Sequence, residues 1–345
     1  MRRPLRRIGV AGAVAAAATA SAAVATASAQ RRRARRSWQA TPAPDRLGGL
    51  RGETMTVAGD GDVPLHVEID EPESRDPEAP TIVFVHGWML TLDCWHLQRL
   101  AFRPSHRMVL YDQRSHGRSG TVEASDCTVG QLARDLERVI EAAAPEGPLV
   151  LVGHSMGGMT IMEYAKQRPD VMEDRVIGLA LLSTSAGDLG QLLPGRVGRA
   201  LKTRSPALLA LGARVPRLVR AGRRVTSGPA YGATKRLAFG DEDVPPEYAA
   251  FTDAMISASE ASVVWDFWPL ISGLDEYASL AGFDGIPTMV AVGSRDLLTP
   301  VRHAHRIADL VPDSRVVVFE GAGHMIMLEC ADEITKLIEE LAGPG

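Results

Sequence analysis

The sequence predicts an α/β fold, with a mostly parallel sheet covered by helices on both faces and an inserted helical cap. Short apolar runs typical of buried strands alternate with helical segments over residues 50–187 and 286–345. The alternation stops over residues 188–285, where the sequence becomes helical and arginine-rich. With 45% hydrophobic and 23% charged residues, the chain can bury a large core. We therefore expect one large domain interrupted by a cap.

The individual elements follow from these apolar runs and from the helical periodicity between them. We expect an edge strand over residues 66–69 and further strands over 81–85, 108–111, 149–152, 176–182, 288–292 and 315–319. Helices are expected over residues 129–144, after Ser155, around residues 303–305 and from about Asp332 onward. Because short apolar strands alternate with helices, most strand pairs should be parallel and buried on both faces.

Residues 1–40 are expected to be a signal peptide or an N-terminal anchor, followed by a basic tail. Four arginines precede the apolar stretch from Ile8 to Ala29, which ends in Ala27-Ser28-Ala29. This is the layout of a signal peptide with an A-x-A-like cleavage site. The stretch is also long enough to span a bilayer, so an uncleaved anchor is the alternative. We therefore expect an exported or cell-envelope protein, with cleavage favoured over anchoring.

The charge distribution argues against a nucleic-acid partner. Residues 1–36 hold nine arginines and no acidic residue, and the remainder of the chain carries 29 basic and 42 acidic residues. The part expected to fold is therefore acidic, whereas nucleic-acid binding requires a basic surface. The cysteines Cys94, Cys127 and Cys330 are odd in number and lack the spacing of metal ligands. One disulfide with a free thiol and three reduced cysteines both remain open.

The motif GHSMGG, residues 153–158, follows an apolar strand run and opens onto a helix. Gly153 and Gly157 remove the two Cβ atoms that would collide where strand and helix converge. Ser155 would then lie at the apex of a tight turn, in a sparsely populated backbone conformation, with its hydroxyl exposed in a cleft. The alternative is an ordinary strand-to-helix turn in which Ser155 only caps the helix.

Two further residues complete a candidate catalytic triad with Ser155. Asp296 follows the strand expected over residues 288–292, and His324 follows the strand expected over 315–319. In a parallel sheet such loops meet at the carboxyl edge. A serine hydroxyl needs a base, which the imidazole of His324 would supply, and Asp296 would stabilise the protonated imidazole. The chain order of serine, aspartate and histidine fits this architecture.

A tetrahedral oxyanion also requires hydrogen-bond donors, and two backbone N–H groups are candidates. Met156 directly follows the candidate nucleophile, and Trp88 lies in His86-Gly87-Trp88, which follows an early strand. The alternative interpretation of the second segment is a glycine turn with a packing tryptophan. No cofactor is required by this chemistry.

Other polar residues compete less well for these roles. Asp188 follows the strand expected over residues 176–182 and is the alternative acid. His303 and His305 are two residues apart on an expected helix and point in different directions, so no metal site is expected there.

The motifs FVHGW, YDQRSHGRSG, VGHSMGG, GSRDLLTP and GAGH resemble those of the α/β-hydrolase superfamily over residues 55–182 and 284–340. The resemblance implies an α/β-hydrolase fold with Ser155 as nucleophile, Asp296 as acid and His324 as base. It implies Trp88 and Met156 as the oxyanion hole. Where relatives commonly read DxRGHGxS, this chain has Ser115 in place of the first glycine of that motif, which affects a structural turn.

The resemblance also implies the kind of reaction. Relatives that act on epoxides or alkyl halides carry an aspartate at the position of Ser155, in the tight strand-to-helix turn called the nucleophile elbow. A serine at that position forms an acyl-enzyme with esters, thioesters or amides. We therefore expect a carboxylic ester hydrolase, esterase-like or lipase-like, whose partner is a small acyl ester. The alternatives are a C–C bond hydrolase, a cofactor-free peroxidase or an aminopeptidase, or a ligand-binding member without catalysis.

The expected cap carries a basic amphipathic segment. Residues 189–240 hold eleven lysines and arginines and no acidic residue, and Ser205-Pro206 is a plausible helix start. Five apolar residues would then share one helix face and four arginines the opposite face: Leu208, Leu211, Val215, Leu218 and Val219 against Arg214, Arg217, Arg220 and Arg224. An ordinary solvated surface helix has this pattern too. The sharper hypothesis is attraction of the cap to an anionic membrane surface or to acidic substrate head groups.

Overall fold

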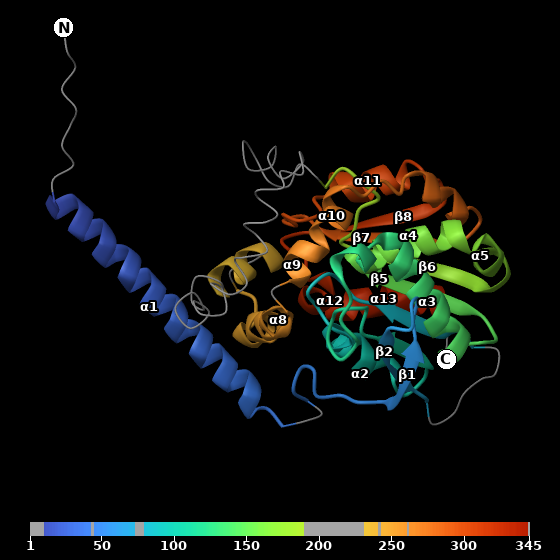
Figure 1. The fold of residues 1–345 in the computed structure, drawn as a ribbon, viewed down its shortest axis with the longest axis horizontal. Coiled ribbons are helices and arrows are strands. Elements are labelled where there is room, and N and C mark those ends of the chain that lie inside the picture. The colour runs from blue at the N-terminus through green and yellow to red at the C-terminus, as the bar shows by residue number, and fades with distance from the viewer. Residues whose placement is uncertain are drawn as a thin grey trace, which may run out of the picture.

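The computed structural model describes residues 10–42, 45–72, 79–189, 231–240, 243–260 and 262–343. Within these residues, eight strands form one sheet in the order β1-β2-β4-β3-β5-β6-β7-β8 (Figure 1). The strands are β1 (Glu53–Ala58), β2 (Pro64–Asp70), β3 (Thr81–Val85), β4 (Met108–Tyr111), β5 (Leu149–His154), β6 (Val176–Leu182), β7 (Thr288–Gly293) and β8 (Ser314–Phe319). The pairs β1–β2 and β2–β4 are antiparallel and all others are parallel. The predicted α/β fold with a mostly parallel sheet is confirmed.

Each predicted strand is present, but the predicted edge of the sheet was wrong. β2 was expected at the edge, whereas β1 pairs with it along its whole length, from Glu53 opposite Ile69 to Ala58 opposite Pro64. In β1 only Val57 is buried, and most of its other side chains are exposed. A strand that buries so little apolar surface leaves no apolar run in the sequence, so its position is decided by pairing with β2.

Helices cover both faces of the sheet, and the alternation of side chains along each strand divides the core in two. In β3, Ile82 and Phe84 face a layer that contains α2 (His96–Phe102) and α13 (Ala331–Ala342). Val83 and Val85 face the layer of α3 (Val129–Ala143), α4 (Met156–Gln167) and α11 (Arg302–Ala308). All four side chains are fully buried, and each contributes roughly 1.5–3 kcal/mol. This rigid sheet fixes where the loops at its carboxyl edge lie.

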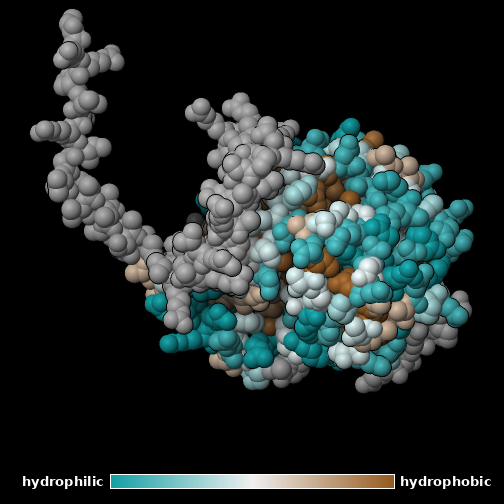
Figure 2. All heavy atoms as spheres, in the orientation of Figure 1, coloured by the Kyte–Doolittle hydropathy of each residue, from teal (hydrophilic) through white to brown (hydrophobic). Residues whose placement is uncertain are grey.

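The described part of residues 188–285 contains several helices, and the predicted cap insertion stays a prediction. It contains a helix over residues 231–238, followed by α8 (Pro246–Ala258), α9 (Val263–Asp266), α10 (Trp268–Ser272) and η4 (Ala278–Phe283). A single bridge between Gly187 and Asp275 brings the two ends of this cap together. On the face shown in Figure 2 the surface is mostly hydrophilic, and hydrophobic side chains gather near its middle, beside α9 and α10. The basic helix predicted from Ser205 lies outside the described residues.

The N-terminal helix α1 (Val10–Ala40) continues through the arginines that were expected to form a tail. Its C-terminal end packs on α8, where Arg31 Nε lies 2.8 Å from Asp253 Oδ2 and the Trp38 ring contacts the Phe251 ring at a tilt of 50°. Figure 1 shows the N-terminal part of α1 projecting away from the body. Among the described residues, no helix has both the length and the apolar character needed to cross a membrane. The signal peptide and the anchor stay predictions.

The structure also shows the conformation of Ser115 and the state of the three cysteines. Ser115, the residue that replaces a glycine of the family motif, has a φ of 62°, in the left-handed region that favours glycine. Its hydroxyl accepts a hydrogen bond from Val122 N at 3.1 Å, which ties the turn to the following loop. Cys94, Cys127 and Cys330 are all free, so these three described cysteines form no disulfide.

Candidate active site

Ser155 lies at the turn between β5 and α4, with φ 51° and ψ −116°. This sparsely populated conformation is held from both sides. Ser155 N donates to Leu182 O at 2.9 Å, and the hydroxyl of Thr184 donates to Ser155 O at 2.7 Å. The Ser155 side chain makes no capping hydrogen bond to α4, so the alternative of a capping serine does not describe this turn. The hydroxyl is left available for chemistry.

The two elbow glycines stand where their sequence positions required them. A Cβ on Gly153 would lie 2.7 Å from the carbonyl carbon of Gly157, and a Cβ on Gly157 would lie 2.0 Å from Val85 O. Real Cβ atoms do not approach backbone atoms so closely, so any larger residue would push α4 away from β3. Glycine at both positions lets the helix begin directly against the strand.

Asp296 and His324, on the loops after β7 and β8, form a buried pair. His324 Nδ1 lies 2.8 Å from Asp296 Oδ2, and the same oxygen accepts from the Thr299 hydroxyl at 2.8 Å. Asp296 Oδ1 accepts from the N–H groups of Leu298 and Thr299 at 2.8 and 2.9 Å. Burial alone would raise the pKa of Asp296, but His324 and these donors lower it well below its usual range. The carboxylate is therefore ionised beside the imidazole.

His154 connects the serine elbow to the histidine loop. Its Nε2 donates to the backbone carbonyl of His324 at 3.0 Å, and the two imidazole rings lie 4.7 Å apart. Burial lowers the pKa of His154 well below its usual range, so this imidazole is neutral. The structure thus joins the residue before Ser155 to the backbone of His324. No hydrogen bond joins the Ser155 and His324 side chains themselves, and such contacts often tighten only when substrate is bound.

The segment with Trp88 packs directly on the elbow. A Cβ on Gly87 would lie 2.7 Å from His154 Nδ1 and 3.1 Å from Ser155 Cβ, so only a glycine lets this backbone approach so closely. Met156 is the first residue of α4, and the N–H groups of a first helical turn have no acceptor within the helix. The two N–H groups predicted to bind an oxyanion therefore lie on segments that meet at Ser155.

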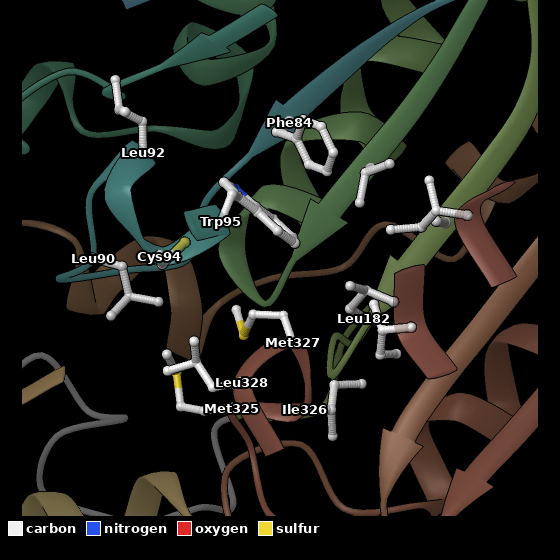
Figure 3. Packing of buried hydrophobic residues seen from close by; sticks show 14 of the residues in the cluster. Phe84, Leu90, Leu92, Cys94, Trp95, Leu182, Met325, Ile326, Met327 and Leu328 are labelled. Atoms are coloured by element: carbon white, nitrogen blue, oxygen red, sulfur yellow. The ribbon is translucent and has the colours of Figure 1, made fainter. Parts of the chain in front are cut away.

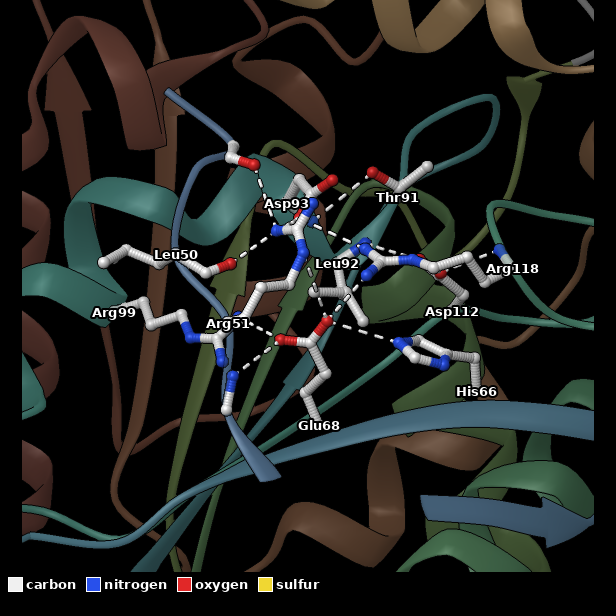
Figure 4. A network of polar contacts seen from close by, with 12 residues as sticks. Leu50, Arg51, His66, Glu68, Thr91, Leu92, Asp93, Arg99, Asp112 and Arg118 are labelled. Atoms are coloured by element: carbon white, nitrogen blue, oxygen red, sulfur yellow. Dashed lines mark hydrogen bonds and ion pairs between the residues drawn. The ribbon is translucent and has the colours of Figure 1, made fainter. Parts of the chain in front are cut away.

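A polar network fixes the loop that follows Trp88 (Figure 4). Asp112 Oδ1 accepts from Leu92 N at 2.8 Å, and its Oδ2 accepts from Arg118 N at 2.9 Å. Arg118 also donates to Asp93 at 3.2 Å and to Glu68, on β2, at 2.7 Å. Because these carboxylates are largely buried, removing one partner would leave an unpaired charge that costs several kcal/mol. The network therefore holds the loop to the antiparallel edge of the sheet.

Apolar packing joins the same loop to the histidine loop. Figure 3 shows Leu90 and Trp95 facing the residues that follow His324, from Met325 to Leu328, with Leu92 farther along the same loop. All of these side chains are buried and belong to one core cluster. The candidate oxyanion loop and the loop of the candidate base thus share one hydrophobic support.

An apolar wall adjoins the elbow on the cap side. A buried cluster includes Met156 and contacts Trp88; its members are Cys127, Leu132, Met156, Met159, Leu189, Val263, Phe267, Leu270, Ile271 and Leu274. The Trp88 side chain also donates to Val263 O, in α9, at 3.2 Å. Apolar side chains from α3, α4 and the 263–274 segment therefore pack together beside the turn that carries Ser155.

The competing residues lie elsewhere. Asp188 is exposed and accepts from the Tyr277 hydroxyl at 3.0 Å, with no bond to His324. His303 is buried with its Nδ1 2.8 Å from Ser185 Oγ, whereas His305 is exposed. No group of three or more histidine, cysteine or acidic side chains in the described ranges is arranged to hold a metal ion.

Sequence reasoning missed two supporting residues. Thr299 bonds to Asp296 through both its N–H and its hydroxyl. An aspartate followed three residues later by threonine is a local turn signal that could have indicated this. His154 stands within the quoted elbow motif, but its bond to a carbonyl 170 residues away leaves no local signal.

Comparison with known proteins identifies the family of the chain. Residues 80–331 match the family described as alpha/beta hydrolase fold. The chain is 27% identical over 298 residues to a provisionally named carbamate hydrolase, RutD, of Azorhizobium caulinodans, covering 84% of this chain and 98% of that protein. It is 26% identical over 272 residues to the bifunctional esterase/perhydrolase DCH of Acinetobacter calcoaceticus, covering 75% and 90%.

Solved structures show the same fold. A thermophilic esterase from Thermogutta terrifontis superposes with a TM-score of 0.64 at 24% identity, over 84% of this chain and 97% of that one. An enzyme that degrades N-acyl homoserine lactones superposes with a TM-score of 0.61 at 25% identity, over 83% and 99%. Because the family match extends over most of the chain and the sheet has the same architecture, the protein belongs to the α/β-hydrolase family.

Proposed function

We propose that the protein is a serine hydrolase that cleaves carboxylic esters through an acyl-enzyme intermediate. The observation that carries the proposal is the buried Asp296–His324 pair, with its 2.8 Å contact, held beside a strained Ser155 elbow. The identity with an esterase/perhydrolase over most of both chains supports the choice of ester substrates. The absence of a capping role for the Ser155 hydroxyl supports its use as a nucleophile.

In this mechanism the Ser155 hydroxyl attacks the ester carbonyl while His324 Nε2 accepts its proton. A proton on His324 Nδ1 donates to Asp296, whose ionised carboxylate stabilises the imidazolium that forms. The N–H groups of Trp88 and Met156 bind the oxyanion of the tetrahedral intermediate. The imidazolium then protonates the leaving alcohol, and a water molecule repeats the sequence on the acyl-enzyme.

The apolar cluster beside Met156 supports an acyl or alcohol group of hydrocarbon character. Trp88 would contact that group because its indole lies between the oxyanion segment and α9. The relatives include an esterase/perhydrolase, a protein named as a carbamate hydrolase and an enzyme that degrades N-acyl homoserine lactones. Carboxylic esters are therefore the favoured substrate class, and carbamates are the class to compare with them.

The experiment is hydrolysis of p-nitrophenyl esters of graded acyl length by the purified chain, compared with Ser155→Ala. We expect kcat to fall by roughly 10³-fold or more in the variant, because the triad acts as a unit. A fluorophosphonate probe should label wild type and not the variant. Turnover that is retained in Ser155→Ala, or a p-nitrophenyl carbamate that is cleaved faster than every ester, would overturn the respective part of the proposal.

Two expectations concern where this chemistry takes place, and both stay predictions. The first is export through the N-terminal apolar stretch. The second is attraction of the basic segment around residues 205–224 to an anionic surface. Co-sedimentation with anionic and neutral vesicles tests the second, and binding that is equal for both or indifferent to salt would contradict it.

A further inference from the structure

The last residues of the cap helix over 231–238 pack directly on the loop that carries His324. The carbonyl of Ala238 accepts hydrogen bonds from the N–H groups of both His324 and Met325, each at 2.9 Å. The backbone of the candidate base is therefore bonded to the cap rather than only to the sheet. Any movement of this stretch of the cap relative to the core acts directly on the residue whose imidazole must meet Ser155.

Glycines let these backbones approach as closely as they do. A Cβ on Gly240 would lie 2.2 Å from Gly321 O, and a Cβ on Gly323 would lie 2.4 Å from Gly240 N. A Cβ on Gly293, at the end of β7, would lie 2.2 Å from Gly323 O. The strand end, the histidine loop and the cap chain are thus stacked without side chains between them, so small displacements pass from one to the next.

The carboxylate of Glu329 bridges two of these backbones. Its Oε1 accepts from Gly323 N and its Oε2 accepts from Gly240 N, both at 2.9 Å. Glu329 ends the short helix α12 (Ile326–Glu329), whose apolar residues are buried in the core cluster, so the side chain projects from a fixed support. Arg295 adds a bond from the core, with Nη1 3.2 Å from Gly240 O.

The charge of Glu329 also acts on the candidate catalytic pair. Burial raises the pKa of Glu329, the two N–H donors and His324 lower it, and the Asp296 carboxylate raises it. The net direction is upward, and the groups named include both members of the pair. The Glu329 carboxylate therefore interacts electrostatically with both Asp296 and His324.

We propose that Glu329 is a positioning residue whose carboxylate clips the cap chain at Gly240 to the His324 loop at Gly323. The alignment of the base then depends on the cap being in place. The inference rests on the proposed function, in which His324 is the base. Within that function, it gives a physical link between the element that lies over the substrate and the group that activates the nucleophile.

The test compares Glu329→Gln with Glu329→Asp. The amide of glutamine has one acceptor oxygen and one NH₂ group, so one of the two backbone N–H groups loses its acceptor, and the charge is lost. Aspartate keeps the charge but is one methylene shorter and cannot reach both N–H groups. We expect kcat to fall by roughly 10- to 100-fold in both variants with KM changed by less than about threefold, because small misplacements of a catalytic group are costly.

The pH profile separates positioning from a merely structural role. The acid limb of kcat/KM follows loss of the imidazole proton, so removing a negative neighbour should move this limb to lower pH in Glu329→Gln. The acid limb should stay at the wild-type pH in Glu329→Asp, because aspartate keeps the negative charge. The matched control is Glu320→Gln, which removes an exposed charge from the same loop and should leave kcat and the profile unchanged.

Two measurements keep failure of this inference distinct from failure of the proposed function. If wild type does not turn over esters, the proposed function fails, and NMR titration of the His324 imidazole still tests the inference without activity. Its midpoint should drop in Glu329→Gln, and the Gly240 and Gly323 amides should exchange faster. If Glu329→Gln does not fold, the kcat of Glu329→Asp tests the inference: the expected fall supports it, and a wild-type value contradicts it. Variants that match Glu320→Gln in kcat, profile and amide exchange would overturn the inference.

Discussion

Asp296 is the single residue at which charge and geometry can be separated most cleanly. Asp296→Asn keeps the shape of the side chain but removes the acceptor that holds the His324 proton on Nδ1. We expect kcat to fall by roughly 10⁴-fold, as for a wrong tautomer in a serine protease. The measurement is steady-state hydrolysis of a p-nitrophenyl ester by wild type and variant at equal concentration.

Asp188→Asn is the matched control for that change. Asp188 is exposed and bonds only to the Tyr277 hydroxyl among the contacts described, so its variant should keep near-native kcat. If Asp188→Asn loses the activity and Asp296→Asn retains it, the acid has been assigned to the wrong strand.

At the scale of elements, the contact of α4 with β3 is the one least able to accept extra volume. Gly157→Ala would place a methyl group 2.0 Å from Val85 O, and the buried strand β3 cannot move away to relieve this overlap. We expect the free energy of unfolding to fall by about 3 kcal/mol in urea titration. Gly232→Ala is the control, because its Cβ would meet no atom of the described residues within 4 Å, and alanine is favoured over glycine in a helix by about 1 kcal/mol. Equal stability of the two variants would contradict the packing argument.

The contact between Glu163, on α4, and Glu276, just before η4, should make the free energy of unfolding depend on pH. Burial and the neighbouring Glu163 carboxylate together raise the pKa of Glu276 to about 7. Glu163, which burial alone would make less acidic, is held ionised by Gln167 and Lys166. The folded protein therefore binds more protons than the unfolded chain from about pH 4.5 to 7, so stability should fall as pH rises through this window.

Glu276→Gln removes that dependence, because the amide stays neutral and can still accept from the Ser279 hydroxyl. We expect the variant to be more stable than wild type by about 1–3 kcal/mol at pH 8 and close to wild type at pH 4.5. Urea unfolding across this range gives both curves, and Glu173→Gln, on an exposed position of α5 (Pro169–Arg175), is the control. Parallel curves for wild type and Glu276→Gln would refute the argument.

At the scale of the whole molecule, the packing of α1 on α8 assigns different roles to two parts of the N-terminus. Ala34 is buried, and the Trp38 indole packs against the Phe251 ring and donates to Leu47 O at 3.0 Å. Deleting residues 1–29 keeps these contacts and should leave the unfolding midpoint unchanged. Deleting residues 1–40 removes them and should lower the free energy of unfolding by about 2–4 kcal/mol. Identical urea midpoints for the two truncations would show that this contact adds no stability.

The sequence by itself determined the sheet strands that are apolar runs, the order of the loops at the carboxyl edge, and the elbow around Ser155. These features are local: a buried strand needs consecutive apolar residues, and a tight strand-to-helix turn needs glycine at fixed offsets, as at Gly153 and Gly157. The rule that parallel strands end at one edge then brought Asp296 and His324 together, and the 2.8 Å contact agrees with that expectation.

Only the tertiary structure decided how these groups are supported. β1 is defined by its pairing with β2, because its own side chains bury little. The bond from His154 to His324 O spans 170 residues, and the bond from Gly240 to Glu329 spans 89. Such contacts depend on where two distant backbones meet, and a polar side chain leaves the same local pattern whether its partner is water or a buried N–H. Hydrophobic periodicity depends on residues that are close in sequence, whereas the partners of buried polar groups are determined only by the tertiary packing.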